Sequence, residues 1–388
     1  MKPISPFWLV LALWGAGLGA AAQFGKISII FAQAGAIYPL AGPLALGLLV
    51  SIVGFPGLIF GTTAGLMVRG LGWRRVLVVA LSLGAAVSAV QALFPPMPVM
   101  LALRVLEGFS HLAVVVAAPV LIAQVAPVAR QGLAMTLWST FFAVTYTLLA
   151  VLAPPLVNAA GPGALLLAHA LWMAGFALLL ARMLPRDAPA TWPRLSLPAL
   201  ARDHRAIYAS PRVAAPAMGF VCYTMTYVAL LTLLPPLSGP VLQGLLATLL
   251  PLVSIAVSLL LGVWLLGRIG AVGTVVLGFV AALIGAAGLA LGWGSLVPQL
   301  AASLWIGGAL GLVQGASFAA IPALNPGPGE RAQAAGAIAQ LGNLGTTLGT
   351  PLLGALIADQ GALAVPVFVS LFAVLGIALH LLQAARRQ

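Results

Sequence analysis

About twelve long apolar runs make up most of the chain, and nearly all charged residues lie in the gaps between them. The 388 residues include only 17 Lys and Arg and 5 Asp and Glu, or 6% charged, whereas a soluble domain has about 25%. The runs reach or exceed the roughly 20 apolar residues that a helix needs to cross a bilayer. They lie at 7–33, 40–68, 75–94, 98–125, 132–157, 163–184, 212–235, 241–266, 272–293, 296–321, 333–357 and 363–384. Barrel strands would be about ten residues of alternating polarity, so the sequence predicts an all-α polytopic membrane protein with twelve transmembrane helices.

The basic residues fall almost wholly in alternate gaps, which predicts the orientation of the helices. Gaps after even-numbered runs contain Arg69, Arg74 and Arg75, then Arg130, Arg182 to Arg212, Arg268 and Arg331, and both chain ends are basic. Gaps after odd-numbered runs contain no Lys or Arg. Because positively charged loops stay in the cytoplasm, we expect both termini there. The excess of Arg over Lys favours a bacterial protein, and therefore the bacterial cytoplasmic (inner) membrane.

The N-terminal run has two interpretations. Lys2, an apolar stretch and Ala20-Ala21-Ala22 resemble a signal peptide with its cleavage site. The run continues to about Phe31, however, which favours an uncleaved first transmembrane helix.

The longest polar stretch, 185–211, separates two halves of six runs each. We therefore expect an N-terminal six-helix bundle over 1–184, a cytoplasmic linker over 185–211, and a C-terminal six-helix bundle over 212–388. The linker is either a solvated connection or a short amphipathic helix on the inner leaflet.

Composition disfavours several other functional classes. Cys222 is the only cysteine, so neither an intrachain disulfide nor a cysteine-based metal site is expected, and we predict no metal and no cofactor. The net charge of +12 is spread along the gaps rather than gathered in a patch with aromatic residues, which argues against nucleic acid as a partner. A Gly-x-x-x-x-Gly-Lys-Ser/Thr nucleotide-binding run is absent from the sequence. Expected partners are the lipid bilayer and a small solute, and we expect a monomer.

Short motifs in the gaps resemble those of the major facilitator superfamily. After the second helix that family has Gly-x-Leu-x-Asp-Arg-x-Gly-Arg-Arg, and here the chain reads Gly65-Leu66-Met67-Val68-Arg69-Gly70-Leu71-Gly72-Trp73-Arg74-Arg75. The outer glycines and one of the final basic residues match, while Arg69 stands where the family has Asp. Arg104-Val105-Leu106-Glu107-Gly108 is similar to the family's Arg-x-x-x-Gly in the fourth helix, and Arg268 and Gly270 follow the eighth run.

This resemblance implies the major facilitator fold, with two six-helix bundles that rock about a midplane site by alternating access. It also implies that a loop formed by Gly65, Arg69, Gly72, Arg74 and Arg75 acts as a cytoplasmic gate. The missing acid puts the charge-relay form of that gate in doubt. The antiporter Gly-Pro pattern of the fifth helix is absent, since the chain has Leu152-Ala153-Pro154-Pro155-Leu156 there.

Charged residues within the predicted helices are candidates for function, because a charge inside a bilayer is costly. Arg104, Glu107 and His111 are spaced i, i+3 and i+7 and share one helical face. Glu107 and His111 are therefore predicted to carry protons, with His111 four residues after Glu107 and able to share its proton. The alternative is that Arg104 and Glu107 form a self-neutralising pair that joins their helix to its neighbours.

Lys26 has no acid in its own run, and Gln23 lies on the same helical face. The partner of Lys26 is either Glu107 or a substrate anion, unless the lysine side chain extends toward the outer headgroups. We predict that the solute binds to Lys26, Gln23 and Arg104, together with polar residues of other runs: Tyr146, Tyr223, Tyr227, Gln314, Gln340 and Asn343. For each of these polar residues, hydrogen bonding between helices is the alternative role.

The sequence therefore predicts a secondary active transporter that is driven by an ion or solute gradient, with protons as the expected ion. Two cations facing one acid favour a small organic or inorganic anion as the solute. A drug or metabolite efflux pump of the same fold is the alternative. A non-transporting receptor or a membrane enzyme is a remote one, because the five acidic residues are scattered.

Overall fold

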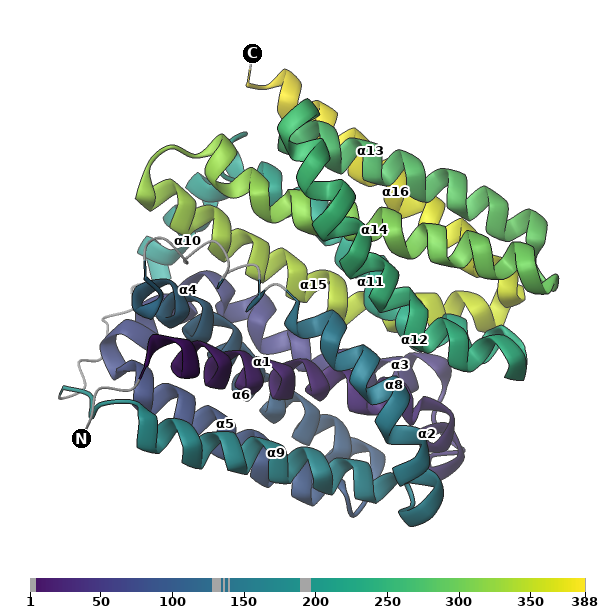
Figure 1. Ribbon diagram of the computed structural model, residues 1–388, viewed down its shortest axis with the longest axis horizontal. Helices are drawn as coiled ribbons and strands as arrows, with labels where there is room; N and C mark the ends of the chain where they lie inside the picture. The colour runs from purple at the N-terminus through teal and green to yellow at the C-terminus, as the bar shows by residue number, and fades with distance from the viewer. Residues whose placement is uncertain (1–4, 128–133, 135–136, 139, 189–196, 388) are drawn as a thin grey trace. The chain divides into compact units, whose positions relative to one another are not determined.

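The structure, a computed structural model, describes residues 5–387 apart from 128–133, 135–136, 139 and 189–196. The regular elements of this described part are all helices (Figure 1). This confirms the all-α prediction.

Ten segments of the described chain are long and apolar enough to cross a membrane, and two of them, Gly239–Gly292 and Gln333–Ala385, span 54 and 53 residues. Each of these two is interrupted by a glycine with a φ of 69°, Gly270 in the first and Gly361 in the second. Only glycine adopts such a φ at little cost, so each long segment contains two crossings. With the eight shorter segments they account for the twelve predicted helices.

Proline and glycine set many of the helix boundaries. Pro6, Pro98 and Pro162 lie in the first turns of their helices, where a missing backbone N–H leaves no intrahelical hydrogen bond unmade. Gly72 and Gly161, both at positive φ, each separate one helix from the next. At these positions the gaps recognised in the sequence are therefore true breaks in the helical backbone.

The chain forms two compact units, and the first comprises Met1–Ala41 and Ile52–Pro193. Its elements are α1 (Pro6–Ile29), α2 (Phe31–Ile37), η1 (Ile52–Gly54), α4 (Phe55–Leu71), α5 (Trp73–Gln91), α6 (Met97–Val125), α8 (Phe141–Ala160) and α9 (Pro162–Met183). Helix α1 packs against α6, α8 and α9, and α5 packs against α6 and α9. Every residue of α1 from Gly15 to Ser28 is buried. Polar side chains in this stretch must therefore find partners within the protein.

The second unit comprises Gly42–Ser51 and Arg194–Gln388. Its elements are α3 (Pro43–Ser51), α10 (Leu197–Ala209), α11 (Ala215–Leu237), α12 (Gly239–Val257), the π-helical turn η3 (Ser258–Gly262), α13 (Val263–Gly292), α14 (Leu296–Leu324), α15 (Pro328–Gln360), η4 (Gly361–Leu363) and α16 (Ala364–Ala385). Helix α11 packs against α15 and α16, while α13 lies beside α14 and α16 (Figure 1). Helix α3 also packs on α15, so this short segment belongs with the second unit although it precedes most of the first.

The described part of the linker contains a helix, α10, that is joined to α15. Tyr208 Oη donates to Gln340 Oε1 over 2.7 Å, and His204 Nε2 lies 3.2 Å from Gln340 Nε2. Burial raises the pKa of Tyr208 to about 12, so the phenol remains a neutral donor at physiological pH. The linker is thus partly helical and attached to the second unit by side-chain hydrogen bonds.

Gly345 allows α15 to lie close to α11. A Cβ at this position would come within 2.7 Å of the Val221 carbonyl oxygen and 2.8 Å of the Met225 backbone nitrogen. Backbone atoms cannot rotate away, so Gly345→Ala is expected to push the helices apart and to cost about 1–3 kcal/mol. The measurement is the thermal midpoint of the purified protein in detergent.

The matched control is Gly175→Ala on α9, where an added Cβ would meet no atom within 4 Å. There the higher helix propensity of Ala should stabilise the protein by up to about 1 kcal/mol. The two variants are therefore expected to shift the midpoint in opposite directions. Equal shifts would show that close approach at Gly345 is unimportant.

Candidate functional site

Four helices of the first unit bring charged and polar side chains together in its interior. The ammonium group of Lys26 on α1 lies 2.6 Å from Glu107 Oε1 on α6 and 2.8 Å from Ser88 Oγ on α5. It also lies 3.2 Å from Nδ1 of His169 on α9. An ammonium group has three N–H donors, and these three partners use all of them. Lys26 is fully buried, so it does not extend toward the headgroups.

Glu107 lies between two cations. Its Oε1 accepts from Lys26, and its Oε2 accepts from Arg104 and, over 2.9 Å, from Gln91 Nε2. A second nitrogen of Arg104 donates to the Gln23 carbonyl oxygen over 2.6 Å. We call Lys26, Ser88, Gln91, Arg104, Glu107 and His169 the Glu107 cluster. Lys26, Arg104 and Glu107 are all 0% exposed, so no water screens their charges.

The two histidines near this cluster are oriented by backbone carbonyl groups. His169 Nε2 lies 2.9 Å from the Gly19 carbonyl oxygen, and His111 Nδ1 lies 2.9 Å from that of Ala20. A carbonyl oxygen only accepts, so these nitrogens carry the hydrogens, and Nδ1 of His169 is left to accept from Lys26. Neutral histidines account for all these contacts. The cluster then holds two positive charges and one negative charge.

The predicted proton sharing between Glu107 and His111 has no direct hydrogen bond in this structure. Within the described residues, the oxygens of Glu107 bind Lys26, Arg104 and Gln91, while His111 binds Ala20 and packs edge-on against Phe24 at a centroid distance of 5.0 Å. His169 instead belongs to the cluster, through the contact of its Nδ1 with Lys26. Of the two histidines, His169 is thus the one placed to exchange a proton within the cluster.

Sequence reasoning missed part of this cluster. The third apolar run, which forms α5, supplied no predicted solute-binding or proton-coupling residue, yet its Ser88 and Gln91 contact Lys26 and Glu107. Ser88 Oγ also donates to the Leu166 carbonyl oxygen. The only available signal was the i, i+3 spacing of these two polar residues in an apolar run. His169 of the sixth run was likewise not among the predicted site residues.

The other predicted solute-binding residues are more dispersed. Gln23 and Tyr146 belong to the first unit, where Gln23 Nε2 donates to Ser110 and Tyr146 Oη lies 3.1 Å from Ser28 Oγ. In the second unit Tyr223 and Tyr227 stack with ring centroids 5.1 Å apart. The remaining three residues of that unit are Gln340, bound to α10; Asn343, whose amide donates to the Ala339 carbonyl oxygen; and the half-buried Gln314. Among the described residues no group of three His, Cys, Asp or Glu could hold a metal ion.

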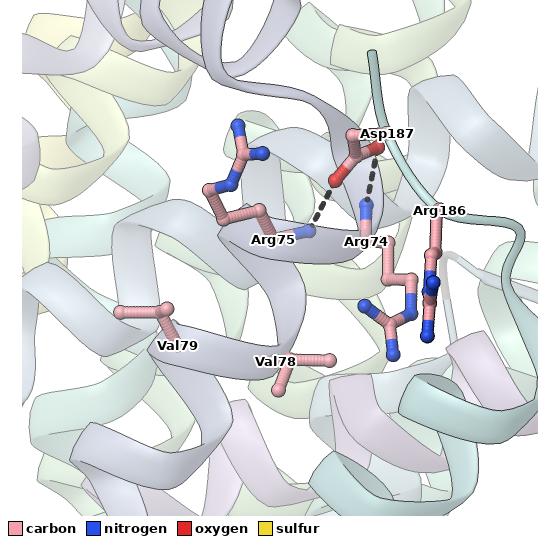
Figure 2. Close-up of a pocket in the computed structure, with 6 residues that line it drawn as sticks. All are labelled: Arg74, Arg75, Val78, Val79, Arg186 and Asp187. Atoms are coloured by element: carbon pink, nitrogen blue, oxygen red, sulfur yellow. Dashed lines mark hydrogen bonds between the residues drawn. The ribbon is translucent and has the colours of Figure 1, made fainter. Parts of the chain in front are cut away.

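An acid from elsewhere in the first unit reaches the predicted gate loop. Asp187, which follows α9, accepts from the backbone N–H groups of Arg74 over 3.2 Å and of Arg75 over 2.7 Å (Figure 2). These N–H groups begin α5, just after Gly72, so the carboxylate caps the helix. For Gly65 and Arg69 the structure describes only the backbone, within α4. Asp187 therefore provides the loop with a carboxylate although Arg69 occupies the motif's acidic position.

Asp187→Ala is expected to destabilise the protein by about 0.5–2 kcal/mol, the usual loss for an N-cap acceptor. Asp187→Asn keeps one acceptor oxygen and should lose less. Thermal midpoints in detergent measure both, with Asp359→Ala at the exposed end of α15 as the control. A midpoint of Asp187→Ala equal to that of the parent would show that the cap contributes nothing.

Comparison with known protein families identifies the family of this chain. A family model described as Major Facilitator Superfamily matches residues 9–350. The chain belongs to the major facilitator superfamily. This confirms the resemblance seen in the loop motifs, and the protein is a membrane transport protein of that superfamily.

Solved structures of this superfamily share the fold. A mutant of the nucleoside transporter NupG aligns with a TM-score of 0.71 and 15% identity, over 97% of this chain and 99% of that one. A mutant of the E. coli fucose:proton symporter FucP aligns with a TM-score of 0.68 and 15% identity, over 99% of both chains. No curated protein matches the chain. Similarity at this identity extends to the fold and not to the solute.

Proposed function

We propose that the protein is a secondary active transporter that moves a small organic or inorganic anion together with protons by alternating access. The observation that carries this proposal is the Glu107 cluster, where one buried carboxylate lies between Lys26 and Arg104. A buried acid that holds two cations is a group whose protonation changes the charge of the whole cluster. The existence of a proton symporter with the same fold supports proton use.

The charges explain how a proton and an anion would be coupled. With Glu107 ionised, the carboxylate occupies the donors of Lys26 and Arg104 that face it. Protonation of Glu107 removes the only negative charge of the cluster and leaves two buried cations without a counter-charge. An anionic solute restores the balance, so each ligand favours binding of the other, and such coupling is necessarily reciprocal. Because the cluster is closed to water here, loading requires a conformation in which it opens.

The remaining parts of the proposal follow the topology of the chain. The bundles over 1–184 and 212–388, joined by the linker 185–211, would be the two moving halves of a monomer. We place both termini in the cytoplasm and the protein in a bacterial inner membrane, because the basic residues occupy alternate gaps.

The test is proton movement in proteoliposomes, with a pH-sensitive dye in the external medium and the membrane potential clamped by an ionophore. A panel of small anions and cationic drugs is added outside. External alkalinisation that depends on one anion is expected for the parent protein and should be lost in Glu107→Gln. The matched control is Asp359→Asn, the same acid-to-amide change at an exposed position, which should retain the signal. Protein-free liposomes account for weak acids that cross the bilayer unaided.

External acidification on addition of cationic drugs would instead identify a drug–proton antiporter, the alternative of the sequence analysis. Anion uptake without proton movement, unchanged in Glu107→Gln, would overturn proton coupling at this residue.

A further inference from the structure

We propose that the first unit carries a binding site for the phosphate headgroup of an anionic phospholipid at the start of α5. The site is a pocket of about 300 Å³ lined by Arg74, Arg75, Val78, Val79, Arg186 and Asp187 (Figure 2). We call it the arginine pocket. It lies at the loop between α4 and α5 and at the segment after α9, and none of its lining residues belongs to the Glu107 cluster.

The arginine pocket has an excess of positive charge that the described protein does not neutralise. Ion pairs between side chains, within the described residues, join only Lys26, Arg104 and Glu107. The carboxylate of Asp187 is held by the backbone N–H groups of Arg74 and Arg75 rather than by their guanidinium groups. Three arginines therefore line one pocket that contains a single carboxylate. Like charges gathered around one pocket repel, and a bound anion reduces that repulsion.

Two of the guanidinium groups are held in place before any ligand binds. Arg74 donates from Nε and from Nη2 to the Ala181 carbonyl oxygen, over 3.0 and 2.9 Å. Arg75 donates from Nη1 to the Leu71 carbonyl oxygen over 2.7 Å. Each still has N–H groups to offer, and a guanidinium group binds phosphate oxygens in a bidentate manner. The pocket thus presents oriented donors instead of freely moving side chains.

The apolar wall of the pocket points to a lipid rather than a soluble phosphate. Val78 and Val79 follow the arginines on α5, and Val79 is 60% exposed. Helix α5 is one of the segments able to cross the membrane, and it begins at Trp73. When α5 crosses the membrane, Arg74 and Arg75 in its first turn would lie at the headgroup layer, and the valines would lie one turn deeper. Basic pockets at this depth bind anionic headgroups.

The test uses the full chain in nanodiscs of phosphatidylcholine with increasing phosphatidylglycerol, followed by native mass spectrometry of the lipids that remain bound. The parent should retain one phosphatidylglycerol in preference to phosphatidylcholine. The variant Arg74→Gln/Arg75→Gln/Arg186→Gln should lose this preference, with at least about a tenfold weaker apparent affinity, as expected for lost hydrogen bonds to a charged group. The control Arg182→Gln/Arg205→Gln/Arg268→Gln removes the same charge at exposed positions outside the pocket, and it should retain the lipid.

Arg186→Gln alone is a second variant, because Arg186 is exposed and its loss removes none of the hydrogen bonds or ion pairs found among the described residues. It should weaken retention in part while the thermal midpoint stays unchanged. In a competition experiment, excess inorganic phosphate is added to the parent protein with its bound lipid. Displacement of the lipid by phosphate, or phosphate binding by the parent in pure phosphatidylcholine nanodiscs, would overturn the lipid assignment in favour of a soluble anion. Equal loss of phosphatidylglycerol from the pocket variant and the control would show general surface attraction only.

Discussion

Glu107→Gln is expected to destabilise the protein by about 3–5 kcal/mol, the usual loss when one partner of a buried ion pair is removed. The substitution leaves Lys26 and Arg104, both 0% exposed, without their negative partner. The new amide also offers an N–H group where three donors already converge. Thermal and denaturant unfolding in detergent measure the loss, with intrinsic fluorescence as the signal.

Lys26→Met should be much milder, which makes the pair of variants diagnostic. It leaves Arg104 and Glu107 as a balanced ion pair and removes the hydrogen bonds to Ser88 and His169. The expected loss is about 1–3 kcal/mol for the polar groups left unsatisfied. Asp359→Asn is the exposed control and should stay within about 0.5 kcal/mol of the parent. Equal losses in Glu107→Gln and Lys26→Met would contradict the charge count of two cations and one acid.

Lys26→Gln is expected to raise the KM for the transported anion by about tenfold or more. The variant removes the positive charge that remains uncompensated when Glu107 is ionised. A hydrogen bond from a charged donor contributes about 1.5–3 kcal/mol to binding. Since about 1.4 kcal/mol corresponds to a tenfold change in affinity, its loss should weaken anion binding at least about tenfold. The measurement is uptake into proteoliposomes of whichever anion drives proton movement in the parent protein, over a range of concentrations. This prediction rests on the proposed function.

Lys26→Arg is the matched control, since it keeps the charge while changing the shape of the donor. It should transport with a smaller rise in KM than Lys26→Gln. Circular dichroism and the thermal midpoint show whether each variant is folded. A folded Lys26→Gln protein with the KM of the parent would assign Lys26 to a purely structural role and leave proton coupling to be explained without it.

The Glu107 cluster shows how far sequence reasoning reached. Lys26, Arg104, Glu107 and His111 were identified because a charge in an apolar run is rare and costly. Glu107 was also one of the two partners considered for Lys26. The choice between Glu107, a substrate anion and the headgroups needed the structure, since the side chain could have pointed to any of them. Ser88 and Gln91 were overlooked because serine and glutamine occur in transmembrane helices for many reasons.

The gate loop gives a second example. The motif showed that the usual acid was replaced by Arg69, and nothing local could indicate that Asp187, over a hundred residues later, accepts from Arg74 and Arg75. Gln340 shows the opposite difficulty. It was predicted to bind solute as a polar residue in an apolar run, and the structure places it against Tyr208 and His204 of α10.

The membrane setting, the twelve helices, their breaks at Pro and Gly, and the loop motifs that indicate the family could all be predicted from the sequence. Each of these is a local property, because apolar length, charge placement and glycine conformation act within one segment. Which polar groups meet could be seen only in the folded protein. Lys26 reaches Ser88, Glu107 and His169 across 62, 81 and 143 residues of chain. Such contacts depend on how α1, α5, α6 and α9 pack, and helix packing is set by side-chain shapes along whole faces rather than by the few residues that carry the charge.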